Sequence, residues 1–220
     1  MPLASSKLVQ ATLRQQIVTQ IRDAILNRSL RPGERLVERE LAAQLGTSLT
    51  ATREALIQLE TEGLITKRPN ATTHVTQLSL EEVAQIFAVR RVLERYAFEE
   101  AARLADRPVN MRLKTLHHRC LEIARANDGA AYVAADLDWH MAVWEATQNS
   151  YLTESLRRLV VPLFGFSSIE VATQHGFDLE KDALSHAALL RAIRANDPVA
   201  AGKAFDRFAR LWMQPGRSDY

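Results

Sequence analysis

Two side chains that can bind a metal lie four residues apart in the stretch DLDWHMAVW, residues 136–144. On a helix this spacing places Asp136 and His140 on one face, one turn apart. A second imidazole in an apolar setting is His186, in LSHAALLRAI. Together they would form a two-histidine, one-carboxylate set with open coordination positions, which suits Zn, Ni, Mn or Fe(II). The alternative is that Asp136 only orients a core histidine.

Helical periodicity runs through the part of the chain that must position these residues. Ser79 with Glu82 predicts a capping box, and Asp197 before Pro198 predicts another helix start. About six helices follow from the breaks in the pattern, which fall at residues 106–109, 127–129, 148–150, 174–178 and 196–198. We therefore expect an all-helical bundle over residues 78–220.

Residues 1–77 show a different pattern and are expected to form a separate domain. Helical stretches are indicated at 8–28, 37–46 and 47–63, and the runs LITK and THVTQ predict a two-stranded hairpin. The last two helices are joined by a tight turn containing Gly46. This is the geometry of a helix-turn-helix, whose second helix enters the major groove of DNA. The fold class is thus mainly α, a winged helix-turn-helix followed by a helical bundle.

The start of the second helix carries small polar side chains that suit phosphate oxygens, namely Thr47, Ser48, Thr50 and Thr52. Arg39 and Arg53 can reach phosphates or a guanine edge. Arg68, in the hairpin, would contact the backbone or the minor groove. The alternative is that the hydroxyls only cap a structural helix and that the arginines are solvated.

Composition limits the remaining classes of protein. The chain has 220 residues, 47% hydrophobic and 25% charged, with a net charge of +2. Its first residues lack the apolar core of a signal peptide, and its longest apolar run is too short for a bilayer. A single cysteine, Cys120, excludes a thiolate zinc cluster. We expect a cytoplasmic protein without membrane contact.

The stretch LRPGERLVERELAAQLGTSLTATREALIQLETEGLI resembles the winged helix-turn-helix of the GntR family of bacterial transcription regulators. The helical remainder resembles the FCD effector domain of its FadR subfamily. The resemblance implies that Arg39, Ser48, Thr50 and Arg53 contact DNA. Leu49 stands where the family usually has an arginine that reads guanine, and a leucine can contact a thymine methyl instead.

Many FCD domains hold a divalent metal through an aspartate, a histidine one turn later and two histidines from later helices. Asp136, His140 and His186 fall on three of those positions, whereas the fourth falls on Phe208. The resemblance therefore implies either a three-ligand site for Zn, Ni or Mn, or a pocket that has lost its metal and binds a more apolar acid. Arg90 or Arg91 could pair with an effector carboxylate, and Asn149 could line the cavity or cap the next helix.

Three functions remain open from the sequence. The first is a homodimeric, ligand-responsive regulator, expected to be a repressor, that binds operator DNA and a small organic acid. The second is an iron enzyme that uses Asp136, His140 and His186 as a facial triad, although no general base beyond these ligands is evident. The third is an architectural DNA-binding protein whose helical domain only dimerises. The effector and the operator sequence are not evident.

Overall fold

The first part of the fold is a small head of helices and strands. The computed structural model describes residues 13–68, 72–173 and 178–212. In the head these form α1 (Leu13–Leu26), β1 (Arg35–Leu36), α2 (Glu38–Gln44), α3 (Leu49–Thr61), β2 (Ile65–Arg68) and β3 (Thr72–Val75). The described strands make one antiparallel sheet in the order β1-β3-β2. The hairpin expected from the sequence is thus present, with β1 added to its edge.

The strand β1 corrects the sequence-based expectation, which assigned RPGERL to a turn. Only two residues pair, Arg35 with His74 and Leu36 with Thr73. So short a run carries no alternation that a sequence could reveal, and its partner lies far along the chain. The helix start predicted from local capping residues is confirmed, because Ser48 caps α3 by accepting a hydrogen bond from Ala51 N.

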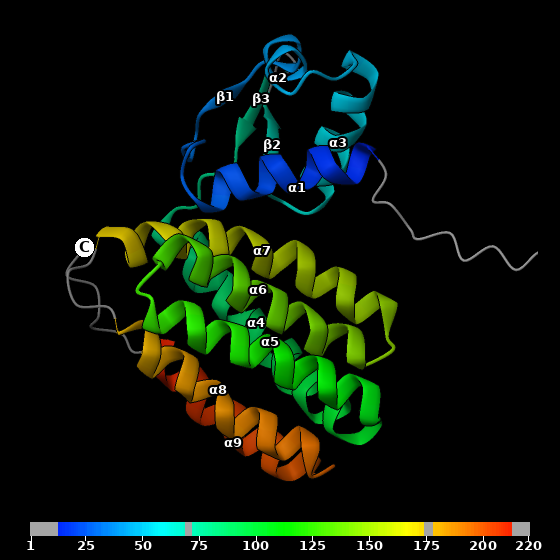
Figure 1. The fold of residues 1–220 in the computed structure, drawn as a ribbon, viewed down its shortest axis with the longest axis vertical. Helices are drawn as coiled ribbons and strands as arrows, with labels where there is room; N and C mark the ends of the chain where they lie inside the picture. Colours follow the sequence, from blue (N-terminus) through cyan, green and yellow to red (C-terminus); the bar gives the residue numbers. More distant parts are fainter. Residues whose placement is uncertain (1–12, 69–71, 174–177, 213–220) are drawn as a thin grey trace, which may run out of the picture.

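The second part is a bundle of long helices beneath the head (Figure 1). Its described helices are α4 (Leu80–Leu104), α5 (Arg107–Arg125), α6 (Gly129–Ala146), α7 (Ser150–Thr173), α8 (Leu179–Arg194) and α9 (Pro198–Trp212). This confirms the expected number of helices. The capping box of Ser79 and Glu82 begins α4, and Asp197 caps α9 by accepting from Ala200 N. None of the described helices combines the length and apolarity needed to cross a membrane.

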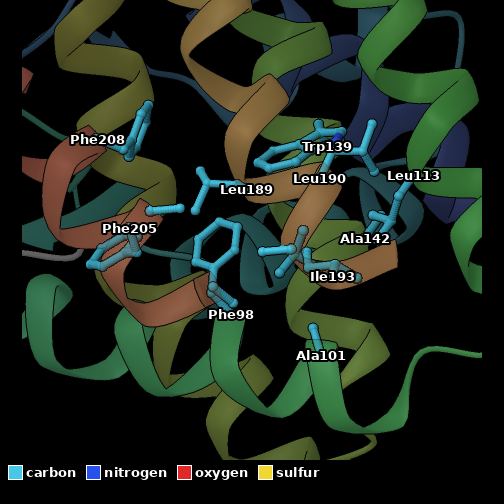
Figure 2. Packing of buried hydrophobic residues seen from close by; sticks show 14 of the residues in the cluster. Phe98, Ala101, Leu113, Trp139, Ala142, Leu189, Leu190, Ile193, Phe205 and Phe208 are labelled. Carbon is cyan, nitrogen blue, oxygen red and sulfur yellow. The ribbon is translucent and has the colours of Figure 1, made fainter. Parts of the chain in front are cut away.

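The helix α6 is the centre of the bundle. It is apolar on nearly all sides, as expected for a helix surrounded by others, and it packs against α4, α5, α7 and α8. Figure 2 shows part of the apolar packing around it, where Phe98, Phe205 and Leu189 converge from α4, α9 and α8. Asp136 and His140 lie within this apolar environment.

Head and bundle share one hydrophobic cluster. Ile17, Val18 and Ile21 of α1 belong to the same cluster as Leu137 of α6 and Leu156 of α7. In Figure 1, α1 lies along the top of the bundle, next to α7. The burial of this shared apolar surface fixes the orientation of the head on the bundle.

Gly63, two residues after the end of α3, lies close to α7 of the bundle. Its φ is +76°, in the left-handed region, and an added Cβ would lie 2.8 Å from Pro162 Cγ and 3.1 Å from the Arg158 carbonyl oxygen. Gly46, in the turn before α3, has a similar φ of +62° but no atom within 4 Å of an added Cβ. A side chain at Gly46 would therefore cause backbone strain alone, whereas a side chain at Gly63 would cause both backbone strain and a steric clash.

Replacing these glycines tests the contact between head and bundle. Gly46→Ala should lower the free energy of unfolding by about 1–2 kcal/mol, because only the left-handed backbone is strained. Gly63→Ala should cost roughly 1–3 kcal/mol more, because Pro162 or the α7 backbone must also shift. Urea denaturation of both variants measures the difference. Equal losses would show that α7 does not constrain the end of α3.

Candidate functional site

Three buried side chains converge inside the bundle. Asp136 and His140 come from α6, one turn apart, and His186 comes from α8. His186 Nε2 lies 3.2 Å from Asp136 Oδ1 and 3.4 Å from His140 Nε2. One donor atom of each residue lies within 4.8 Å of the other two. The structure thus brings together the three residues that the sequence grouped.

The contacts among these atoms suit a cation better than a hydrogen-bonded cluster. Asp136 Oδ1 is buried and makes no well-directed hydrogen bond among the described residues, although His186 Nε2 is near. Two imidazole nitrogens that face each other cannot both carry a proton without repulsion. Two nitrogens and one carboxylate oxygen are a common donor set for Zn²⁺ and similar ions. The residues present therefore fit a divalent metal.

The carboxylate and the imidazole stabilise each other's charged forms. Burial alone would raise the pKa of Asp136, but the nearby His186 and His140 lower it below its ordinary value. Burial would likewise lower the pKa of His186, but Asp136 raises it above its ordinary value. The ionised carboxylate that a metal requires is thus favoured at neutral pH.

The ring of Phe208, on α9, closes one side of this group. Its centroid lies 4.9 Å from that of His186 and 5.9 Å from that of His140. Phe208 also lines a small cavity of about 10 Å³, together with Phe87, Arg90 and Phe205. The side chain at the position of the fourth family ligand is therefore next to both imidazoles and offers no lone pair.

Arg90 reaches this cavity, but it is not a free cation. Its Nε lies 2.6 Å from Glu94 Oε2, and its guanidinium group lies over the rings of Phe87 and Phe164. Arg91 lines the same cavity and is exposed. An effector carboxylate that binds Arg90 must therefore share it with Glu94.

Glu94 is the residue of this site that the sequence reasoning missed. It is 1% exposed, and its Oε1 accepts a hydrogen bond from Trp144 Nε1 at 3.1 Å and lies 2.9 Å from His140 Nδ1. A signal was present: Glu94 lies on the apolar stripe of α4, one turn before Phe98, where a charge needs a buried partner.

Asn149 corrects another expectation. It is exposed, and its Oδ1 accepts a hydrogen bond from Leu152 N at 3.1 Å. It therefore caps α7, the second of the two roles considered, and it is not among the residues that line the cavity beside Phe208.

The head presents an exposed polar face along α2 and the start of α3. Its exposed members are Arg39, Ser48, Leu49, Thr50 and Arg53. Arg53 donates two hydrogen bonds to Glu38 Oε2, at 2.8 and 3.0 Å, which fix the direction of its guanidinium group. All five side chains are exposed to solvent and thus accessible to a ligand.

Thr52 does not belong to this surface. It is fully buried, and its hydroxyl lies 2.9 Å from that of Thr47, so it stabilises the turn instead of facing DNA. The backbone of Arg68 ends β2, whereas its side chain lies outside the described part of the chain.

Comparison with known protein families assigns both parts of the chain. A model described as FCD domain matches residues 85–210, more than half of the chain. A model described as bacterial regulatory proteins, gntR family, matches residues 13–75. The chain belongs to the GntR family.

Relatives in this family cover most of the chain. A probable D-xylose utilization operon transcriptional repressor of Paenarthrobacter nicotinovorans is 28% identical over 97% of this chain and 92% of its own length. An Uxu operon transcriptional regulator of Escherichia coli (strain K12) is 34% identical over 66% of this chain and 62% of its own length. This GntR-family chain is thus a DNA-binding transcription regulator and not an enzyme, which excludes the iron-enzyme hypothesis.

Solved structures share the fold of this GntR-family chain. E. coli McbR/YncC superposes with a TM-score of 0.80 at 20% identity, covering 93% of this chain and 96% of its own. A putative transcriptional regulator GntR from Rhodococcus sp. RHA1 gives a TM-score of 0.69 at 22% identity, covering 90% and 94%. At these identities the likeness concerns the fold alone.

A second carboxylate near the site, which is partly buried, makes stability depend on pH. Asp182 of α8 accepts a 2.6 Å hydrogen bond from the Tyr132 hydroxyl. Burial and the nearby Asp136 raise its pKa from 3.8 to about 6. Because the folded protein holds this proton more strongly, the resulting stability is complete below pH 3.8 and is lost as the pH rises through about 6.

Asp182→Asn should therefore remove part of this dependence. The amide keeps an acceptor for Tyr132 but cannot ionise. As the pH rises through about 6, the melting temperature of the metal-free variant should therefore increase relative to that of the metal-free wild type. Thermal melts across this window in the presence of a chelator measure the effect. Asp106→Asn, at the exposed cap of α5, is the control, because asparagine caps equally well. Parallel curves for Asp182→Asn and the wild type would contradict the prediction.

Proposed function

We propose that this regulator is a repressor whose bundle binds a small carboxylate effector through a divalent metal held by Asp136, His140 and His186. The observation that carries the proposal is the convergence of three buried donor atoms within 4.8 Å of one another. Three protein ligands leave positions open for water or for effector oxygens. The described ligands suit Zn, Ni or Mn.

The proposed response depends on the helices that join the site to the head. Asp136 and His140 lie on α6, whereas Leu137, between them, belongs to the cluster shared with α1. Phe164 of α7 has its ring 5.9 Å from His140, two residues after the Pro162 that meets Gly63. An effector that binds one arrangement of α6 and α7 preferentially would shift the position of the head.

Operator binding is proposed for a homodimer, with the two heads on half-sites of one palindrome. The proposed DNA-contacting residues are Arg39, Ser48, Leu49, Thr50 and Arg53, with Arg68 from the wing. The proposed domains are residues 1–77, which bind DNA, and residues 78–220, which bind the effector and dimerise. The repressor role is supported by the name of the Paenarthrobacter relative, which describes repression of a D-xylose utilization operon.

Metal content decides between the two effector-binding modes. Purified wild type should contain near-stoichiometric metal by mass spectrometry, and His140→Ala and His186→Ala should each lose it, because the described part of the chain supplies three ligands and each variant removes one. No metal after incubation with Zn, Ni and Mn would overturn the proposed site. The apolar ring of Phe208 would then favour a metal-independent pocket for a more apolar acid.

Phe208→His should restore a fourth ligand. We expect Zn²⁺ affinity to rise about tenfold or more, because a fourth imidazole completes a tetrahedral shell. Competition with a chromophoric chelator gives the affinity. Phe87→His is the matched control, because Phe87 lines the same cavity but makes no ring contact with either imidazole among the described pairs. Equal affinities for Phe208→His and the wild type would place Phe208 outside the coordination shell.

Removing the exposed arginines of the head should weaken DNA binding. Arg39→Ala and Arg53→Ala should each reduce the slope of log affinity against log salt by about 1, because each loses one phosphate contact. Fluorescence anisotropy on a duplex from the chain's own promoter measures the slope. Lys114→Ala, an exposed cation on α5, should leave it unchanged. Unchanged slopes for both arginine variants would remove them from the interface.

A further inference from the structure

We propose that Glu94 is the positioning residue of the metal site, holding His140 as the Nδ1–H tautomer so that the lone pair of Nε2 points at Asp136 and His186. The inference rests on the proposed function for the identity of the ligand. The tautomer itself is a property of the metal-free protein and can be tested without metal.

The hydrogen-bond inventory of Glu94 assigns its role as an acceptor. Trp144 Nε1 can only donate, and it lies 3.1 Å from Oε1. Arg90 Nε can only donate, and it lies 2.6 Å from Oε2. The guanidinium group favours the ionised carboxylate, and both oxygens then accept. Burial would raise the pKa of Glu94, but the charge of Arg90 and the hydrogen bonds that Glu94 accepts lower this pKa to about 2, in agreement with this inventory.

An ionised Glu94 requires a proton on His140 Nδ1. The Nδ1 to Oε1 distance is 2.9 Å, and Glu94 is the described hydrogen-bond partner of that nitrogen. Aromatic rings of Phe98, Trp139 and Phe164 surround the imidazole on other sides. In the neutral ring a protonated Nδ1 leaves Nε2 as an acceptor, which is the form that binds a metal.

The ring orientation then places this lone pair at the centre of the site. His140 Nε2 lies 3.4 Å from His186 Nε2 and 3.9 Å from Asp136 Oδ1. The contact between Glu94 and His140 Nδ1 is a carboxylate–histidine pair of the kind that orients metal ligands and raises their basicity. The same carboxylate holds Arg90 beside the cavity that Phe208 lines. Glu94 thus connects His140, a proposed metal ligand, to Arg90, the side chain expected to pair with an effector carboxylate.

The decisive variant is Glu94→Gln, which keeps the size of the side chain but removes its charge. Its NH₂ group can turn toward His140 Nδ1 and favour the opposite tautomer. We expect Zn²⁺ affinity to fall about 10- to 100-fold, the usual effect of losing such an outer partner. Glu100→Gln is the matched control, because Glu100 lies on the same helix and pairs with Arg103 near the surface. It should keep the wild-type affinity.

Nitrogen-15 NMR of the histidine rings in metal-free protein provides the direct reading. Wild type should show His140 as the neutral Nδ1–H tautomer, and Glu94→Gln should lose this single form. A merely structural role for Glu94 would not change the tautomer. The wild-type spectrum stands even if Glu94→Gln fails to fold.

The outcomes separate this inference from the proposed function. An Nε2–H tautomer in the wild type would overturn the role of Glu94, as would a Glu94→Gln variant that binds Zn²⁺ as tightly as a metal-binding wild type. A wild type with the Nδ1–H tautomer that binds no Zn²⁺ would refute the metal site, while Glu94 would still be shown to orient His140.

Discussion

Burying ionised side chains costs several kcal/mol for each ion unless partners replace the lost water. The bundle carries this constraint at its centre, because α6 places Asp136 and His140 among apolar neighbours. Their partners come from other helices, His186 from α8 and Glu94 from α4. Since each charge is compensated across a helix pair, the polar cluster fixes how these helices sit on one another. Apolar packing alone would tolerate more rearrangement.

The helix α6 was predictable from local signals, and so was the pairing of its two polar residues. Spacing along one helix places Asp136 and His140 on one face without knowledge of the fold. The caps at Ser48, Ser79 and Asp197 were predictable for the same reason, because an N-cap acts within three residues. His186 could be grouped with them from its residue type and its apolar helical setting, and the resemblance to a family supported that grouping, but its proximity depends on tertiary packing.

What the sequence could not supply is contact over long separations. Glu94 reaches His140 across 46 residues, and β1 pairs with a strand far along the chain. Thr52 was expected to face DNA because its residue type suits phosphate, but the rotation of α3 turns it inward. Asn149 fits a cap by its local sequence alone, and of the two roles left open the structure shows the cap.

The free volume beside Phe208 is about 10 Å³, roughly room for one water. If the proposed effector enters here, α4 and α9, which line the cavity, would have to separate to admit it. Association would then be limited by the frequency of opening rather than by diffusion, and the observed affinity would be reduced by the fraction of open molecules. Such a regulator would respond to the average level of its effector rather than to brief changes in concentration.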